Sequence, residues 1–434
     1  MKRKEFVQTI AGAFTGMLGA DSFLNLSPDF ARRLTKLIDS HGSDVDANDE
    51  TFWSVVRDQF PLTRERAYFN TGGLGASPYA VIEAVKRKMD ELETISEVGH
   101  TEEIWAAVKG KAARILGADP SEVTLTSCAT EGINIVVDGL PLKRGDEVIT
   151  TTHEHVGGIL AWLARQKLDG IVVKWFEPTP QNRQENIDRL ARLITSRTRV
   201  ISISHITTTT GQDLPVKEIA QIAKEKGLWF FLDGAQVPGM RPLNVKEIGC
   251  DFYASSGHKW LLAPKRTGLL YVKKELLDTV RPIFVGAYSD NGFDLLTGKL
   301  EFHPTAQRYE YGTYNVPLII GLGAAIDFLQ TIGMENVWKR NQALSTRVFN
   351  GLSGIRNVEV LSPHQADERG AMITFRMSSM KVEKLQSFLA EKYKLRTRFV
   401  GEANLNGLRI STHIYNGSDE VERLIRGVKE AAEL

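Results

Sequence analysis

Short apolar runs alternate with longer amphipathic ones along most of the chain, from about residue 65 onward. Seven of the short runs are typical of β-strands, namely EVTLT, EVITTT, IVVKWF, VISIS, LWFFLD, DFYAS and GLLYVK. Segments between them, such as LPVKEIAQIAKEKG, have the apolar spacing of surface helices. Near-continuous apolar strands separated by helices predict an α/β fold with a mostly parallel seven-stranded sheet that helices cover on both faces.

The chain is long enough for two domains, because 434 residues exceed what one hydrophobic core usually supports. After about residue 330 the pattern changes to a long helix, short strands and a final helix, which predicts a smaller α+β domain. We therefore expect a large domain over residues 81–330 and a small C-terminal domain over 331–434. Residues 51–80 are expected to pack beside the functional site, and residues 1–50 to hold a signal-like segment, a short helix and an acidic linker.

Composition narrows the classes of partner. The net charge is +1, from 54 basic and 53 acidic residues, which argues against a nucleic-acid or polybasic membrane partner. No apolar run reaches the roughly 20 residues that cross a bilayer. The two cysteines, Cys128 and Cys250, form neither a disulfide framework nor a cysteine metal site, and we expect no metal centre.

The N-terminus, MKRKEFVQTIAGAFTGMLGADS, has a basic start followed by a mildly apolar stretch rich in glycine and alanine. Its RKEFVQ segment resembles a twin-arginine export signal, with Lys4 in place of the second arginine. This resemblance predicts a periplasmic protein. The alternative is a frayed amphipathic tail on a cytoplasmic protein.

Polar residues follow two of the predicted strands at their carboxyl ends, where ligands bind in parallel α/β sheets. LWFFLDGAQ ends its apolar run in Asp233, and DFYASSGHKW ends in Ser256, His258 and Lys259. Taken singly, Asp-Gly is most often a turn and a lysine is most often a surface residue. Together, a carboxylate suits a protonated heterocyclic nitrogen, and a hydroxyl and imidazole beside a lysine suit a phosphate and an imine-forming amine.

Two further strand ends add to this chemistry. In TSCATEGIN, small residues and Thr130 lead directly into a helix, whose unpaired N–H groups form an anion site. In EVITTTHEHVGG, His155 could lie flat against a planar ligand, although alone it reads as a structural histidine. An acid, a phosphate cup, a ring-stacking histidine and an amine are what pyridoxal 5′-phosphate (PLP) requires of a protein.

The order of these motifs, from TSCATEGIN through HEH, SHITTTTG, LDGAQ, SSGHKW and YEYGTYN to GLRIS, resembles the class V aminotransferase family of fold type I PLP enzymes. The resemblance runs from about Tyr68 to the C-terminus. It implies a catalytic role for Lys259 as the Schiff-base amine, for Asp233 beside the pyridine nitrogen and for His155 stacked on the ring. It also implies that the cofactor contacts Ala129, Thr130, Thr208, Gln236, Ser256 and His258.

The same resemblance implies how the substrate and a second subunit are bound. Arg409 in GLRIS falls where the family holds the substrate α-carboxylate, and Asn70 leads the loop YFNTGGLGASP beside the substrate. Thr313 in YGTYN would reach the cofactor phosphate of a neighbouring subunit, which implies a homodimer with shared active sites.

Departures from the family pattern favour one branch of it. Cysteine desulfurases carry a cysteine where this chain has LRTRFVGEANL (395–405), and they have asparagine at the position of Thr208. The chain is therefore more similar to the isopenicillin N epimerase-like and C–S lyase-like branches than to cysteine desulfurases.

The predicted activity is a PLP-dependent conversion of an amino acid, free or within a peptide or natural product, in which Lys259 takes the Cα proton. An epimerase-like or aminotransferase-type reaction is favoured, and a β-eliminating C–S lyase is the alternative. A third reading is a catalytically silent protein that keeps the fold for binding. A nicotinamide-dependent oxidoreductase is rejected, because GGLGAS (72–77) lacks the Gly-x-Gly-x-x-Gly spacing.

Overall fold

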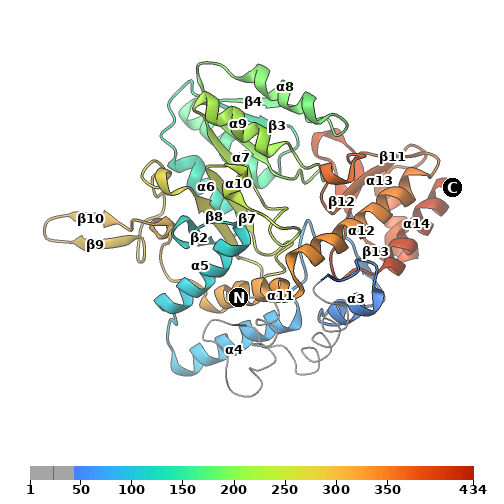
Figure 1. The fold of residues 1–434 in the computed structure, drawn as a ribbon, viewed down its shortest axis with the longest axis horizontal. Helices are drawn as coiled ribbons and strands as arrows, with labels where there is room; N and C mark the ends of the chain where they lie inside the picture. Colours follow the sequence, from blue (N-terminus) through green and yellow to red (C-terminus); the bar gives the residue numbers. More distant parts are fainter. Residues whose placement is uncertain (1–22, 24–43) are drawn as a thin grey trace.

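The computed structural model describes Phe23 and residues 44–434, and Figure 1 shows their arrangement. The predicted export signal and the predicted short helix before residue 43 lie outside these residues. The chain enters the described part through Asp44 and the helix α3 (Glu50–Arg57).

A seven-stranded sheet forms the centre of the larger part of the molecule, with strand order β2-β8-β7-β6-β5-β3-β4. Only β8 is antiparallel to its neighbours, so the predicted mostly parallel α/β sheet is confirmed. All seven apolar runs of the sequence became its strands: β2 (Val123–Thr126), β3 (Glu147–Thr151), β4 (Val172–Phe176), β5 (Thr198–Ser204), β6 (Trp229–Asp233), β7 (Phe252–Ser256) and β8 (Gly268–Val272).

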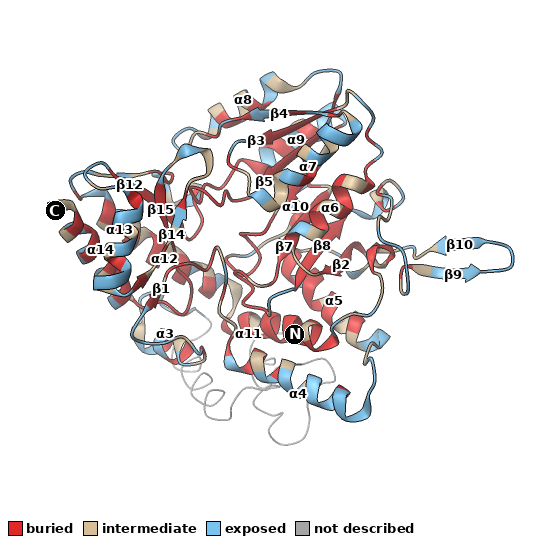
Figure 2. Ribbon diagram, turned by 180° about the vertical axis from the view of Figure 1, so that it is seen from behind, coloured by how far each residue is buried: buried red, intermediate tan, exposed pale blue. Residues whose placement is uncertain are grey.

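Both faces of this sheet are buried, because successive side chains on a strand point to opposite sides. On β6, Phe230 and Leu232 belong to the same core as residues of α5, α9 and α11, whereas Phe231 belongs to the core with α6 and α7. Figure 2 shows the strands as buried ribbons between these helices. The helices are α4 (Tyr79–Ile95), α5 (Glu102–Leu116), α6 (Ala129–Gly139), α7 (Val156–Asp169), α8 (Arg183–Leu193), α9 (Val216–Lys226), α10 (Val245–Ile248) and α11 (Val316–Ile332).

A second, four-stranded antiparallel sheet follows α12 (Met334–Ser353), with strand order β11-β12-β15-β14. Its strands are β11 (Val358–Val360), β12 (Met372–Met377), β14 (Arg398–Val400) and β15 (Gly407–Ser411), and its helices are α13 (Val382–Tyr393) and α14 (Ser418–Glu433). The short strand β1 (Ala67–Tyr68) pairs in parallel with β13 (Leu395–Arg396). This pairing ties the segment before the large sheet to the C-terminal part of the chain.

An antiparallel hairpin of β9 (Asp290–Asp294) and β10 (Lys299–Phe302) projects from the body in Figure 1 and is largely exposed in Figure 2. Within the described part of the chain, no single helix is long and apolar enough to cross a bilayer. The pair α11 and α12, bent by 78°, meets that criterion together by length and composition only.

Candidate active site

The carboxyl ends of five strands meet at one edge of the large sheet. Strand β2 runs parallel to β7, since both are antiparallel to β8, and β3, β5 and β6 run in the same direction. This edge carries most of the residues that the sequence singled out: Ala129 and Thr130 after β2, His155 after β3, Thr208 after β5, Asp233 at the end of β6, and Ser256, His258 and Lys259 at and after the end of β7.

Lys259 is buried, with 8% of its surface exposed, and its amine has no hydrogen bond or ion pair to any residue that the structure describes. Burial lowers the pKa of Lys259 to about 8, although nearby Asp233 acts to raise it. The backbone is held by Gly75, whose N–H donates to the His258 carbonyl at 2.7 Å. A Cβ on Gly75 would lie 2.0 Å from the Lys259 carbonyl oxygen, so the close approach requires glycine. The amine is thus buried, and a larger fraction of it is neutral at a given pH than for an ordinary lysine.

Asp233 presents one held and one available carboxylate oxygen. Its Oδ1 accepts a hydrogen bond from the Ala235 N–H at 2.9 Å. Its Oδ2 has no partner among the described residues. This oxygen lies near Gly158 of α7, because a Cβ added to that glycine would stand 3.2 Å from it. An acidic oxygen left open beside the lysine suits a protonated ring nitrogen, as PLP would supply.

His155 caps the N-terminus of α7. Its Nδ1 accepts from the Gly157 N–H at 3.1 Å, and burial, with Lys259, lowers the pKa of the imidazole. The ring is therefore neutral at pH 7 with its proton on Nε2. A Cβ on Gly157 would lie 2.6 Å from Thr130 Oγ1, which shows that Thr130 reaches the start of α7.

The start of α6 offers an anion-binding cup. Its N-cap, Cys128, makes no capping side-chain hydrogen bond, and the Ala129 N–H donates to Ser256 Oγ at 3.1 Å. The Nδ1 of His258 is buried without a hydrogen-bond partner in the described part of the chain, and burial lowers its pKa to about 4. Unpaired helix N–H groups, Thr130 and a neutral histidine fit a phosphate group.

Gln236 connects the large sheet to the N-terminal segment. Its Nε2 donates to the Gly72 carbonyl at 3.0 Å and to Thr208 Oγ1 at 3.3 Å, while its Oε1 accepts from Trp260 Nε1 at 2.8 Å. The amide is engaged within the protein, so its contact with the cofactor's ring oxygen stays a prediction.

Arg409 is fully buried and has no carboxylate partner among the described residues. Its Nη1 donates to the carbonyl and the Oγ1 of Thr208, both at 2.7 Å, and its Nη2 donates to Asn70 Oδ1 at 3.3 Å. Its Nε is buried without a partner, and burial lowers the pKa of the guanidinium to about 9. A buried cation paired only with neutral groups is costly, and a substrate carboxylate would complete it.

Two charged residues beside this site were missed from the sequence. Arg398 on β14 stands directly opposite Arg409 on β15 and forms an ion pair with Glu402. In the sequence, residues 395–405 differ from cysteine desulfurases by lacking a cysteine, and nothing there marks Arg398 as a site residue. The period-2 alternation of Arg396 and Arg398 was a weak signal, because such short strands do not reveal their register.

Glu154 was also missed. Its carboxylate accepts hydrogen bonds from the N–H and hydroxyl of Ser204 and from the hydroxyl of Thr151. Burial raises its pKa to about 7, and the negative charge of Asp233 acts in the same direction. A partly neutral Glu154 limits the negative charge at this sheet edge.

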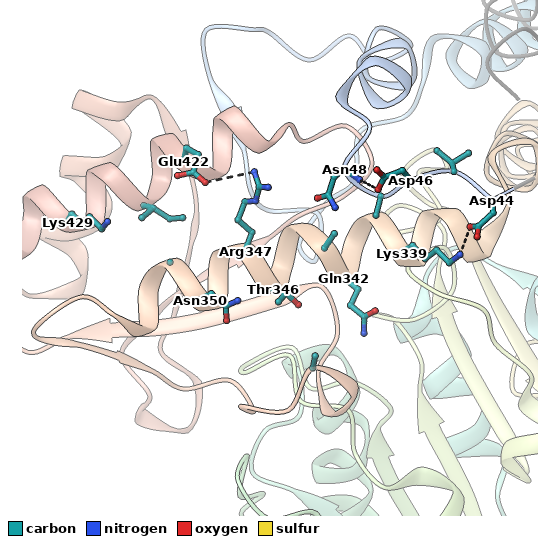
Figure 3. A pocket seen from close by; sticks show the side chains of 16 residues that line it. Asp44, Asp46, Asn48, Lys339, Gln342, Thr346, Arg347, Asn350, Glu422 and Lys429 are labelled. Atoms are coloured by element: carbon teal, nitrogen blue, oxygen red, sulfur yellow. Dashed lines mark hydrogen bonds and ion pairs between the residues drawn. The ribbon is translucent and has the colours of Figure 1, made fainter. Parts of the chain in front are cut away.

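Thr313 does not join the cluster, because its side chain is exposed and makes no hydrogen bond to the other predicted residues. A groove of about 1250 Å³ lies elsewhere, between residues 44–48, α12 and α14 (Figure 3), and no predicted site residue lines it. The described residues contain no group of three or more histidine, cysteine or acidic side chains that could hold a metal ion.

The chain is similar to a well-defined set of proteins. Residues 78–424 match the model of the family "Aminotransferase class-V". A cysteine desulfurase of Cronobacter sakazakii is 30% identical over 86% of this chain and 96% of its own. An isopenicillin N epimerase of Amycolatopsis lactamdurans is 28% identical over 88% and 98%. Most of the similar proteins are named cysteine desulfurases.

Solved structures agree with this set. A cystine C–S lyase in complex with cysteine persulfide is 26% identical, with a TM-score of 0.79 over 86% of this chain and 99% of that one. A mutant of that lyase, with glycine covalently linked to its PLP cofactor, has the same sequence identity, TM-score and coverage. The buried Lys259 amine, the open Asp233 oxygen and the cup at α6 fit the same cofactor. The chain therefore belongs to the class V aminotransferase family and is a PLP-dependent enzyme with the fold type I architecture.

Proposed function

We propose that this enzyme cleaves the bond between Cβ and a sulfur substituent of an amino acid by β-elimination. The observation that carries the proposal is the composition of the site: a buried unpaired Lys259 amine and a buried Arg409, beside a 395–405 segment that brings charges and no thiol. The similarity to a cystine C–S lyase supports the same reaction type.

Two residues of the site bind the substrate and the cofactor, and a third transfers a proton. Arg409 binds the substrate α-carboxylate, and the open Oδ2 of Asp233 holds the proton of the cofactor's ring nitrogen. Lys259 accepts the Cα proton. PLP, when bound, would supply the acceptor for the electrons left on Cα. The sulfur substituent then leaves Cβ with its bonding electrons, and hydrolysis of the remaining fragment gives pyruvate and ammonia.

The positions of the two cysteines argue against transfer of sulfur to a protein thiol. Cys250 is buried, and burial raises the pKa of its thiol well above the usual range. Cys128 lies at the start of α6, in the predicted phosphate cup. Sulfur is therefore expected to leave on the departing fragment.

Epimerisation is the second candidate, because one relative is named an isopenicillin N epimerase and 98% of its length is covered. Incubation of the holoenzyme in D₂O with cystine, S-substituted cysteines and amino acids without a leaving group separates the candidates. Pyruvate in equal amount to ammonia supports elimination. Deuterium at Cα with inversion and without pyruvate supports the epimerase, keto acids from all substrates support transamination, and the absence of any turnover supports a silent binding protein.

We further propose that the enzyme is a homodimer exported to the periplasm. The dimer follows from the implied role of the exposed Thr313, and export follows from the RKEFVQ motif. Light scattering of purified protein at about twice the 48.3 kDa chain mass supports the dimer. A cytosolic protein that keeps Met1 in fractionated cells would contradict export.

Replacing Arg409 with glutamine should raise the apparent KM for the substrate roughly 100-fold, since a charge-assisted hydrogen bond is worth about 2–3 kcal/mol. The glutamine can still bond to Thr208, so the cofactor colour should remain. Steady-state kinetics and an absorbance spectrum check both results. Loss of the colour would show that Arg409 supports the fold rather than the substrate.

The rate at which apoenzyme takes up PLP covalently should rise with pH and level off above about pH 9. The neutral amine is the reacting form, and burial lowers the pKa of Lys259 to about 8 from the ordinary 10.5. Below the pKa the neutral fraction falls tenfold per pH unit, so the half-maximal rate should lie near pH 8. Stopped-flow absorbance between pH 7 and 10 measures it. A rate still climbing at pH 10 would contradict the lowered pKa.

A further inference from the structure

Two arginines lie side by side on neighbouring strands of the small sheet. Arg398 on β14 and Arg409 on β15 are directly opposite in the antiparallel register, so their side chains share one face. On the other side of β15, Thr374 stands opposite Arg409, and its hydroxyl donates to the Thr209 carbonyl at 2.5 Å. This face therefore packs against the segment after β5, at the active-site edge of the large sheet.

The guanidinium of Arg398 is only partly neutralised. Its Nη2 pairs with Glu402, whereas its Nη1 is buried and has no partner in the described part of the chain. Arg409 likewise has a buried Nε without a partner. Like charges directly opposite on a sheet are unfavourable, and Glu402 is the only carboxylate among the described residues that pairs with either arginine, so a bound anion would stabilise the pair further.

Electrostatics place Arg398 within reach of the reacting groups. The positive charge of Arg398 acts to lower the pKa values of Lys259, His155 and Arg409. Glu402 acts in the opposite direction on His155 and Arg409. The ion pair is partly exposed, and it lies close enough to Lys259, His155 and Arg409 for its charges to act on them.

The loop that carries Glu402 is held in an unusual backbone conformation. Ala403, Asn404 and Asn406 all have positive φ, at 51°, 56° and 47°. Asparagine adopts such conformations more readily than other non-glycine residues, but they are unfavourable for alanine, so the surrounding structure must hold Ala403. Here they turn the chain sharply between β14 and β15 and keep Glu402 beside Arg398.

We propose that Arg398 is a specificity residue that binds a carboxylate on the substrate's side chain while Arg409 binds the α-carboxylate. The enzyme then prefers amino acids that carry two carboxylates, and Glu402 sets the strength of that preference by competing for Arg398. The inference rests on the proposed function of this site, because it assumes that Arg409 holds the α-carboxylate.

The test compares matched ligands on the holoenzyme: S-carboxymethylcysteine against its side-chain amide, and glutamate against glutamine. The Kd comes from the change in cofactor absorbance, and pyruvate release is measured separately for the cysteine pair. The native enzyme should bind each acid about 10- to 100-fold more tightly than its amide. Arg398→Gln should reduce that ratio to about one, and Glu402→Gln should increase it.

Arg376→Gln serves as the matched control, since Arg376 is an exposed arginine on the same sheet that pairs with Glu359. It should leave the acid-to-amide ratio unchanged. Equal binding of acid and amide by the native enzyme overturns the inference, as does an equal loss of both in Arg398→Gln. Pyruvate release without acid preference overturns only the inference, whereas acid preference without pyruvate supports it and overturns the proposed lyase reaction.

Discussion

Replacing Lys259 with alanine should lower turnover at least about 1000-fold and prevent borohydride from fixing PLP to the chain. The reason is that one amine serves both as the covalent anchor of the cofactor and as the base for the Cα proton. Its side chain makes no hydrogen bond or ion pair to a described residue, so its removal breaks no internal polar contact. Mass spectrometry after reduction and a steady-state assay measure the two effects.

Lys265→Ala is the appropriate control, because Lys265 lies six residues further along and is exposed. It should retain borohydride labelling and full activity. If PLP were still fixed to the Lys259→Ala protein, another lysine would be the anchor and the assignment of this site would be wrong. A melting temperature close to that of the native enzyme excludes misfolding as the cause of lost activity.

Replacing Asp233 with asparagine should lower kcat about 100- to 1000-fold, as expected for the loss of one preorganised electrostatic group. The asparagine oxygen can still accept from the Ala235 N–H, which preserves the local turn. A neutral amide, however, does not favour a proton on the cofactor's ring nitrogen. The electrons left on Cα are then less strongly withdrawn, and the chemical step slows.

The readouts are kcat and the absorbance maximum of bound cofactor, which should shift when the ring nitrogen loses its proton. Asp251→Asn is the matched control, since Asp251 precedes β7 at the opposite edge of the same sheet and accepts from the Phe230 N–H. It should leave the spectrum unchanged. An Asp233→Asn enzyme with native kcat and native spectrum would show that this carboxylate is only a turn residue.

The seven strands were predictable because each is a short apolar run ended by polar residues, and burial on both faces demands that pattern. Asp233 and Lys259 were recognisable for a related reason. Both follow such runs, and the parallel direction of the strands brings their carboxyl ends to one edge without any knowledge of contacts. The motif order then pointed to the family, which residues 78–424 confirm.

The substrate side of the site was less accessible to sequence reasoning. Arg409 lies 201 positions from Thr208 and 339 from Asn70, the two residues that hold it. The resemblance named all three, but no local pattern predicts that they touch. The branch of the family also stayed open, because its distinction depends on the chemistry after the Cα proton is lost.

The amino-acid pattern alone established the α/β architecture, the strand-end chemistry and the family, because these depend on local alternation and on residue type. Folding buried the Lys259 amine, whose pKa is lowered, and the Arg409 guanidinium, which has no carboxylate partner among the described residues, because burial depends on what packs around a side chain. It also supplied the pairing of Arg398 opposite Arg409. That pairing depends on the register of two short strands. A slip of one residue would have turned the side chain of Arg398 to the other face of the sheet.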